Sequence, residues 1–102
     1  MILWKNYENN EKNIWGYALV YNGFDAFLHK HKEAETYYFI YGVGKLYIDG
    51  YIYIIKSPKI VYIPGNMYHA MTPISDYVLL LYNFNNCCKF ENINYHYLSS
   101  KL

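Results

Sequence analysis

Residues 23–42, with the sequence GFDAFLHKHKEAETYYFIYG, decide the fold and the candidate site of this chain. Within them His29 and His31 are separated by one residue, and Glu35 follows four residues after His31. Alternate side chains of a strand share a face, so a strand over residues 24–31 would point both imidazoles the same way. Imidazoles together with a carboxylate are ligands that Mn, Fe, Ni, Cu and Zn accept. The stretch therefore predicts a transition-metal site on a β-strand.

A third histidine, His69, comes shortly after the turn signal PGN at residues 64–66, and we assign it to the same site. Glu33 is an alternative to Glu35 as the carboxylate, because it has the parity of the first two histidines along an extended strand. Its neighbours are typical of a solvent-facing turn, which favours Glu35. The fourth histidine, His96, lies in a polar segment and is expected on the surface.

The composition favours β-structure throughout. Apolar residues make up 54% of the 102 residues, and the chain has 15 tyrosines, a residue that suits a pleated, half-buried surface. The length predicts one domain over residues 1–102. Strands are expected, between turn signals, at residues 14–21, 24–31, 36–41, 45–49, 51–55, 60–63, 68–72 and 77–82. Short strands at this spacing, without helical periodicity, predict an all-β sandwich or barrel.

Some turns and one strand carry more specific expectations. Asp49-Gly50 is a two-residue hairpin signal, and GVG at residues 42–44 is expected to turn the chain. The run YVLLLY at residues 77–82 is apolar without a break, which is typical of a strand covered on both faces. The core is expected over about residues 14–82, with arms at both ends of the chain.

Charge and composition exclude several classes of protein. The formal net charge is +1, which argues against nucleic acid as a partner. The sequence contains no arginine, so no guanidinium can clamp a phosphate. The chain lacks an apolar run of membrane-spanning length and an apolar signal segment, so neither a membrane nor secretion is expected. Adjacent Cys87 and Cys88 would form a strained disulfide and are expected to be reduced, in a cytoplasmic protein.

The spacing of the opening stretch resembles the first motif of the cupin superfamily. Gly23, His29, His31, Glu35 and Gly42 match that motif at every fixed position.

The second cupin motif, G-x5-P-x-G-x2-H-x3-N, is matched in part. Pro64 and His69 fall in place, whereas Pro58, Asn66 and Pro73 stand where the motif has two glycines and an asparagine. Asparagine tolerates the left-handed backbone that glycine would supply, so the turn at residue 66 is expected to have a positive φ.

The resemblance implies a double-stranded β-helix, or jelly-roll barrel, with one divalent transition metal at its mouth. Carried over residue by residue, the ligands are His29, His31, Glu35 and His69. The metal would be Fe, Mn, Zn or Ni. The superfamily includes dioxygenases, sugar isomerases and epimerases, decarboxylases and binding domains, and the fold does not choose among them.

Side chains beside the metal are expected to form a pocket for a small molecule. The expected lining residues are Tyr37, Phe39, Tyr53, Met67 and Met71. Tyr41 shares the parity of Tyr37 and Phe39 and is expected to point inward with them. Walls of tyrosine, phenylalanine and methionine suit a small, partly apolar ligand.

Chain length and residues 35–50 resemble small stand-alone cupins that are similar to sugar isomerases of the mannose-6-phosphate type. The first expectation is therefore a metal-dependent isomerase or epimerase of a sugar or keto acid, and the absence of arginine argues against a phosphorylated substrate. An Fe(II)-dependent dioxygenase and a non-catalytic small-molecule-binding or sensor domain are the alternatives.

Aromatic residues at both ends of the chain predict a homodimer. They would leave more aromatic surface exposed than a monomer usually does, and pairing of terminal edge strands would cover it. These residues are Trp4, Tyr7, Phe90, Tyr95 and Tyr97.

Overall fold

The computed structural model describes residues 2–10, 13–23, 27–85 and 93–101, and the side chains of residues 14–23, 28–84 and 93–97. Every regular element in these ranges is a strand, as the composition predicts. The strands are β1 (Ile2–Asn10), β2 (Asn13–Tyr21), β3 (Phe27–Lys30), β4 (Glu35–Tyr41), β5 (Val43–Ile48), β6 (Tyr51–Lys56), β7 (Lys59–Ile63), β8 (His69–Pro73), β9 (Tyr77–Asn85) and β10 (His96–Lys101). The described ranges contain no helix that could span a membrane.

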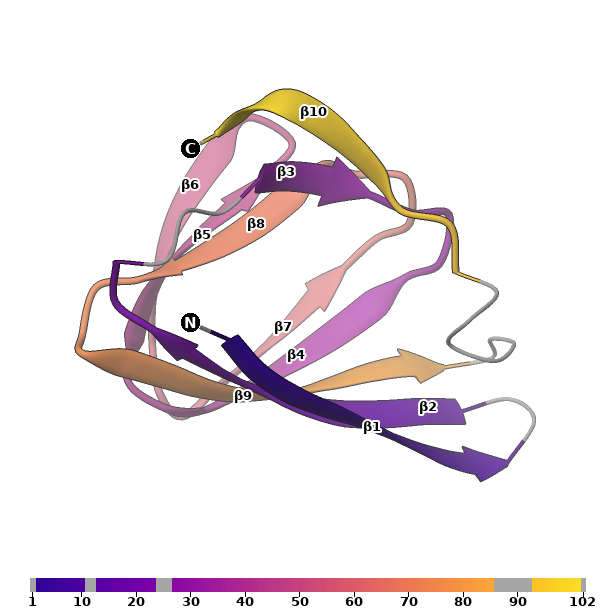
Figure 1. Cartoon of the computed structure of the whole chain (residues 1–102), viewed down its shortest axis with the longest axis horizontal. Coiled ribbons are helices and arrows are strands. Elements are labelled where there is room, and N and C mark those ends of the chain that lie inside the picture. The colour runs from indigo at the N-terminus through magenta and orange to yellow at the C-terminus, as the bar shows by residue number, and fades with distance from the viewer. Residues whose placement is uncertain (1, 11–12, 24–26, 86–92, 102) are drawn as a thin grey trace.

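The strands form two five-stranded antiparallel sheets that face each other (Figure 1). Sheet A has the order β1-β2-β9-β4-β7, and sheet B has the order β10-β3-β8-β5-β6. Several neighbours in each sheet come from distant parts of the chain, as in β2 with β9 and β3 with β8. This arrangement confirms the expected jelly roll. The expected arms are edge strands of the barrel, β1 in sheet A and β10 in sheet B.

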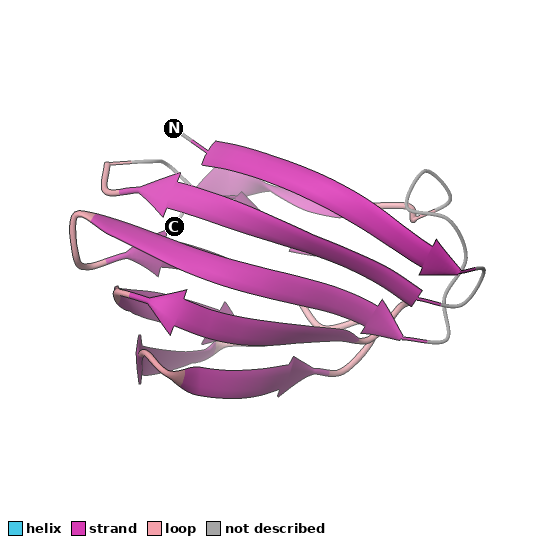
Figure 2. Ribbon diagram, turned by 90° about the horizontal axis from the view of Figure 1, so that it is seen from below, coloured by secondary structure: helices cyan, strands magenta, loops and turns pink. Residues whose placement is uncertain are grey.

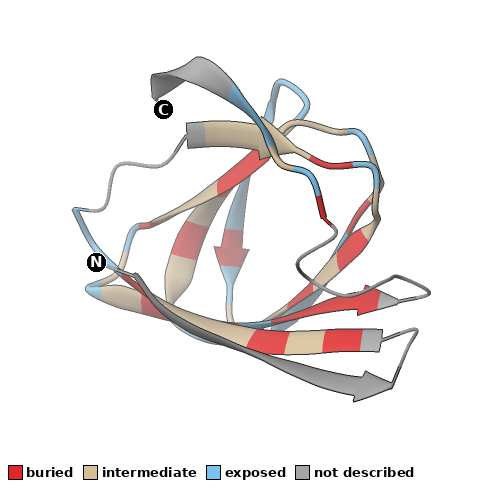
Figure 3. Cartoon of the chain, turned by 45° about the vertical axis from the view of Figure 1, so that its right-hand side comes forward, coloured by how far each residue is buried: buried red, intermediate tan, exposed pale blue. Residues whose placement is uncertain are grey.

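The core fills the space between the sheets. Residues from both sheets are buried there, and Figure 3 shows buried segments along the strands of both sheets. Its most buried apolar side chains are Ile14, Phe39, Leu46, Ile63, Val78 and Phe84. Ile93, which follows the last undescribed segment, is also part of this core. The C-terminal segment is thus packed into the barrel.

Two turns lie at the ends of β5, one within sheet B and one that joins sheet A to sheet B. Asp49 and Gly50 have φ angles of 47° and 91°, which confirms the tight hairpin between β5 and β6. Gly42 has a φ of 99°, and a Cβ there would collide with the backbone oxygen of Tyr77. The chain reverses at Gly42 alone, so the prediction of a turn over residues 42–44 is wrong: Val43 already begins β5.

A bulge in β4 overturns the prediction that Tyr41 points inward. Phe39 pairs with Leu80 of β9, and Tyr41 pairs with the next residue, Leu79. Strand β4 therefore has one extra residue, Ile40, between these two pairs. The extra residue reverses the parity, and Tyr41 lies on the outer surface, stacked on Tyr77 with ring centroids 4.8 Å apart.

Strand β9 is covered on one face only. Val78, Leu80 and Tyr82 point into the core, whereas Leu79 is half-buried and Leu81 is exposed on the outer side of sheet A. The prediction of cover on both faces is therefore wrong for the chain taken by itself. Cys87, Cys88 and Phe90, and the side chains of Trp4 and Tyr7, lie outside the described residues.

Candidate metal centre

The three predicted histidines meet between β3 and β8. His29 lies on β3 and pairs directly with His69, the first residue of β8, while His31 lies just beyond the end of β3. The ring centroid of His69 is 4.4 Å from that of His29 and 5.1 Å from that of His31. One nitrogen of each ring lies within 4.8 Å of the others, so the three residues could hold a metal ion. The strand is shorter than predicted, but the histidines come together as expected.

The turn at residues 64–66 positions His69. The backbone N–H of Asn66 donates to the backbone oxygen of His31, at 2.7 Å, which ties the second motif to the first. A Cβ on Gly65 would collide with the backbone oxygen of Lys32, so only glycine fits there without a shift. Asn66 has a φ of 61°, which confirms the left-handed turn expected from its place in the motif.

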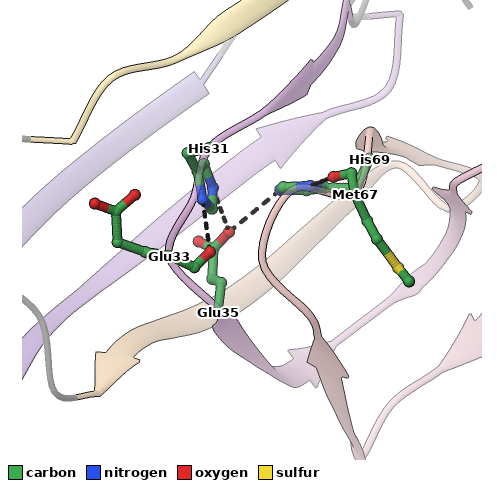
Figure 4. A network of polar contacts seen from close by, with 5 residues as sticks. All are labelled: His31, Glu33, Glu35, Met67 and His69. Atoms are coloured by element: carbon green, nitrogen blue, oxygen red, sulfur yellow. Dashed lines mark hydrogen bonds and ion pairs between the residues drawn. The ribbon is translucent and has the colours of Figure 1, made fainter.

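Backbone carbonyls orient two of the imidazoles (Figure 4). The Nδ1–H of His31 donates to the backbone oxygen of Glu33, and that of His69 to the backbone oxygen of Met67, each at 2.9 Å. A carbonyl only accepts, so Nδ1 carries the proton and the Nε2 of a neutral ring presents a lone pair. Both Nε2 atoms are buried, and neither has a hydrogen-bond partner among the described residues.

The carboxylate of Glu35 faces these two nitrogens. Its Oε1 is 3.3 Å from the Nε2 of His31 and 3.3 Å from the Nε2 of His69, and all three side chains are buried (Figure 4). Lone pairs on neutral imidazoles would repel a carboxylate at this distance, so the arrangement requires a cation or protons between them. Two ligand atoms bound to one ion at about 2.1 Å, at tetrahedral or octahedral angles, lie roughly 3.0–3.4 Å apart. The observed separation fits a shared divalent metal.

The pKa values reflect the same contacts. Burial lowers the pKa of His31, but the nearby carboxylate of Glu35 outweighs it, so this pKa is raised above its ordinary 6.5. Burial raises the pKa of Glu35, but His31 and His69 outweigh it, so this pKa is lowered from its ordinary 4.5. A proton on His31 and a bound cation would therefore compete for the same place beside Glu35.

Glu33 and Glu35 take different roles. The side chain of Glu35 approaches the histidines, whereas Glu33 contacts His31 through its backbone oxygen (Figure 4). Both carboxylate oxygens of Glu33 are nevertheless buried and have no hydrogen-bond partner among the described residues. The geometry favours Glu35 as the carboxylate nearest to a metal and leaves Glu33 as a second buried acid beside it.

Tyrosines surround the site. Tyr37 is buried with its ring centroid 6.2 Å from that of His69, and burial followed by the charge of Glu35 raises its pKa well above the ordinary value. The same two causes raise the pKa of Tyr82 to about 12. Tyr95 lies over His31 and His29, with ring centroids 5.1 and 5.5 Å away, and its pKa is raised by burial and then by Glu35. These phenols are protonated at neutral pH.

The other predicted pocket residues are distributed unevenly. Phe39 is buried in the core, and Met71 packs partly buried against that core. Met67 supplies the carbonyl that orients His69. Tyr53 lies exposed on the edge strand β6, which β5 separates from β8, so the structure does not bring it to the histidines. His96 is exposed, as expected.

Sequence reasoning assigned Tyr95 to a terminal surface and missed its place beside the histidines. The available signal was the alternation of Ile93, Tyr95 and Tyr97 in an otherwise polar tail, which is typical of one strand face. Tyr97 pairs with His29 across β10 and β3, and its ring centroid is 5.7 Å from that of His29. The C-terminal segment therefore forms one side of the site.

Two facing antiparallel sheets with a cluster of histidines between β3 and β8 define a double-stranded β-helix, and the chain has the cupin fold. Solved structures of this fold superpose well. An RmlC-like cupin of Methanocaldococcus jannaschii has a TM-score of 0.76 at 18% identity, over 84% of this chain and 81% of that one. A cupin-like protein of Thermotoga maritima has a TM-score of 0.80 at 17% identity, over 97% and 77%. A DMSP lyase structure has a TM-score of 0.79 at 17% identity, over 93% and 51%.

Among curated proteins, the chain is similar to a 5-nitrosalicylic acid 1,2-dioxygenase of Bradyrhizobium. The two are 30% identical over 67 residues, which is 66% of this chain and 32% of that enzyme. The chain thus matches about a third of the length of this relative. No protein-family model matches the chain.

Proposed function

We propose that the chain binds one divalent transition metal through His29, His31, His69 and Glu35 and acts with it on a small molecule. The observation that supports this proposal is the pair of buried Nε2 atoms, on His31 and His69, that face one carboxylate oxygen without a hydrogen-bond partner among the described residues. A bound metal would polarise a substrate oxygen or, as iron, support oxidation by dioxygen.

The residues of the chain would hold and shape the site. The carbonyls of Glu33 and Met67 fix the imidazoles, so the ligand nitrogens are preorganised. Tyr37 is buried and Tyr95 is half-buried; both phenols remain protonated and could donate to a ligand oxygen. Phe84, whose ring centroid is 5.2 Å from that of His31, helps to exclude water.

Within this class we propose a dioxygenase that acts on a small, partly aromatic acid. The similarity to the curated dioxygenase supports this choice, and the tyrosine-rich surroundings of the histidines suit a planar ring. The absence of arginine fits a substrate without phosphate.

An isomerase or epimerase of a sugar or keto acid is the second candidate. Such a reaction needs a base beside the metal, and the buried, unpaired carboxylate of Glu33 is the candidate that favours it among the described residues. A non-catalytic sensor would use the same ligands. The cytoplasmic location, the homodimer and the absence of nucleic-acid and membrane partners stay predictions.

Metal analysis of the untagged protein tests the site. We expect about one ion per chain in the wild type and in His96→Ala, and a sharp loss in His29→Ala and His69→Ala, since His96 is exposed and is not one of the three histidines that come together. Equal metal content in all of these proteins would refute the site. Oxygen uptake by the Fe(II)-loaded protein with substituted salicylates supports the dioxygenase, whereas sugar turnover without oxygen uptake supports the isomerase.

A further inference from the structure

The outer face of sheet A departs from the usual pattern of an antiparallel sheet. Such a sheet commonly alternates apolar residues toward the core with polar residues toward water. Here most outward positions of the middle strands are apolar as well, with Thr36 and Asn83 as exceptions. Tyr17 of β2, Leu81 of β9, Tyr38 of β4 and Ile60 of β7 lie side by side in one row across four strands. The sequence of these strands is therefore typical of a sheet that is buried on both faces.

Aromatic contacts extend this surface in both directions. Trp15 lies against Tyr38 with ring centroids 5.6 Å apart. Toward the other end of the strands, Tyr77 contacts Tyr21 at 6.1 Å and stacks on Tyr41 at 4.8 Å. Figure 2 looks onto this sheet from its outer side, where no described segment of the chain crosses it. The chain therefore does not cover its own apolar face.

No residue that points outward from the described parts of β2, β4, β7 and β9 carries a charge, and at the edge of the sheet the register sets Lys5 of β1 opposite Tyr17. A charged face would require an oppositely charged partner, because burying unpaired charge is costly. An uncharged apolar face can pack against its own copy without burying a charge. Two-fold symmetry would bring the same patch of each protomer together, and paired sheets pack about 10 Å apart.

The exposed area of this face is of the size that a dimer needs. Its exposed members have between 37% and 65% of their surface accessible; they are Tyr21, Ile40, Tyr41, Ile60, Tyr62 and Leu81. Together these fractions amount to about three fully exposed large side chains, or roughly 600 Å² at ~200 Å² for each. A stable interface buries about 800 Å² per partner, and the half-buried neighbours on the same face supply more.

We propose that the outer face of sheet A is the interface of a face-to-face homodimer of this chain. The interface is the face of the sheet and not the terminal edges that the aromatic ends of the sequence suggest. The metal site lies on β3 and β8 of sheet B and in the loop after β3, so the dimer forms whether or not the metal function proposed above is correct.

Sedimentation equilibrium of the wild type, Ile60→Lys and Ile54→Lys tests the proposal. Ile60 and Ile54 are 65% and 61% exposed, but Ile54 lies on β6 at the edge of sheet B. We expect a dimer of 12.3 kDa chains for the wild type and Ile54→Lys. In Ile60→Lys a buried ammonium should weaken association about 100-fold or more.

Circular dichroism and thermal unfolding show whether each variant is folded, and Leu81→Asn replaces Ile60→Lys should that variant fail to fold. A wild type that remains monomeric at about 100 micromolar would overturn the proposal, because a standard interface is stable well below that concentration. So would a dimer that Ile54→Lys dissociates and Ile60→Lys leaves intact.

Discussion

The backbone conformation of a single residue, Asn66, sets the direction of the chain that leads to His69. Its backbone is left-handed, with a φ of 61°, and its N–H donates a hydrogen bond to the backbone oxygen of His31. The chain then continues toward His69. Asparagine adopts this conformation at small cost, and glycine at none. The motif alone was enough to predict the conformation, because few backbones can reverse direction in so short a space.

Substitutions at Asn66 should therefore separate by backbone preference. We expect Asn66→Gly to change the free energy of unfolding by less than about 0.5 kcal/mol. Asn66→Val should lower it by about 1 kcal/mol or more, because a β-branched residue is strained at positive φ, and should weaken metal binding. Denaturation curves and metal titrations of both variants check this. Equal tolerance of valine and glycine would contradict the role of the turn.

The pair of His31 and Glu35 predicts opposite pH responses with and without metal. The raised pKa of His31 contributes stability that is complete below its ordinary 6.5 and is lost as pH rises through the folded value. The lowered pKa of Glu35 contributes stability that is complete above its ordinary 4.5 and is lost as pH falls through the folded value. The metal-free protein should gain most from this pair between pH 4.5 and 6.5.

Metal affinity should fall on acidification, because the imidazoles must lose their protons to coordinate. The fall should begin above pH 6.5, since protonated His31 is stabilised by Glu35. Thermal unfolding from pH 5 to 8 in chelator and in excess metal measures both effects. Glu35→Gln should remove the raised pKa of His31 and flatten the chelator profile. An unchanged profile in that variant would rule out this pair as its source.

Some residues could not be placed from the sequence. The histidines and Glu35 could be predicted from the fixed spacing of a motif. The orientation of Tyr41, in contrast, depends on a bulge between β4 and β9 that no local pattern signals. Tyr53 has the right alternation but lies on an edge strand, and strand order is a property of the whole chain. Tyr95 reaches the site only because its tail pairs with β3. Alternation along a strand predicts which side chains share a face, and the pairing of the strands decides what that face contacts.

At the scale of elements, the loop of residues 64–66 and the loop after β3 act as one unit. Gly65 packs so closely on Lys32 that a side chain would push the two loops apart. The separation would move His69 away from His31, although neither histidine is changed. The first and second motifs are therefore coupled by direct contact.

Gly65→Ala tests this coupling. We expect it to lower the free energy of unfolding by about 1–3 kcal/mol, as overpacking usually does, and to reduce metal affinity. Gly23→Ala is the matched control, since Gly23 has a φ of 93° with open space around it and its turn bonds to Asp76, beyond the end of β8 that is opposite to His69. It should destabilise the protein through strain and leave metal affinity unchanged. Equal loss of metal affinity in both variants would contradict the contact.

At the scale of the molecule, the sequence predicts the all-β class and most strands because apolar alternation and turn residues are local signals. The double-stranded β-helix came from the resemblance of residues 23–42 to a family motif. Local signals did not predict that β10 forms an edge strand of sheet B, because this pairing joins the last strand of the chain to the third. The apolar run in β9 predicted a strand buried on both faces. In one copy of the chain only its inner face is buried.

The pairing of β2 with β9, from Asn13 with Asn85 to Tyr21 with Tyr77, also determines how the protein can fold. Contacts between such distant segments form only after a large loop has closed, and chains dominated by them fold in milliseconds to seconds. His29 and His69 are adjacent only once β3 and β8 have paired, so an ion that they bind would meet both of them only late in folding. We therefore expect metal to act mainly by slowing unfolding, and to leave the rate of folding almost unchanged.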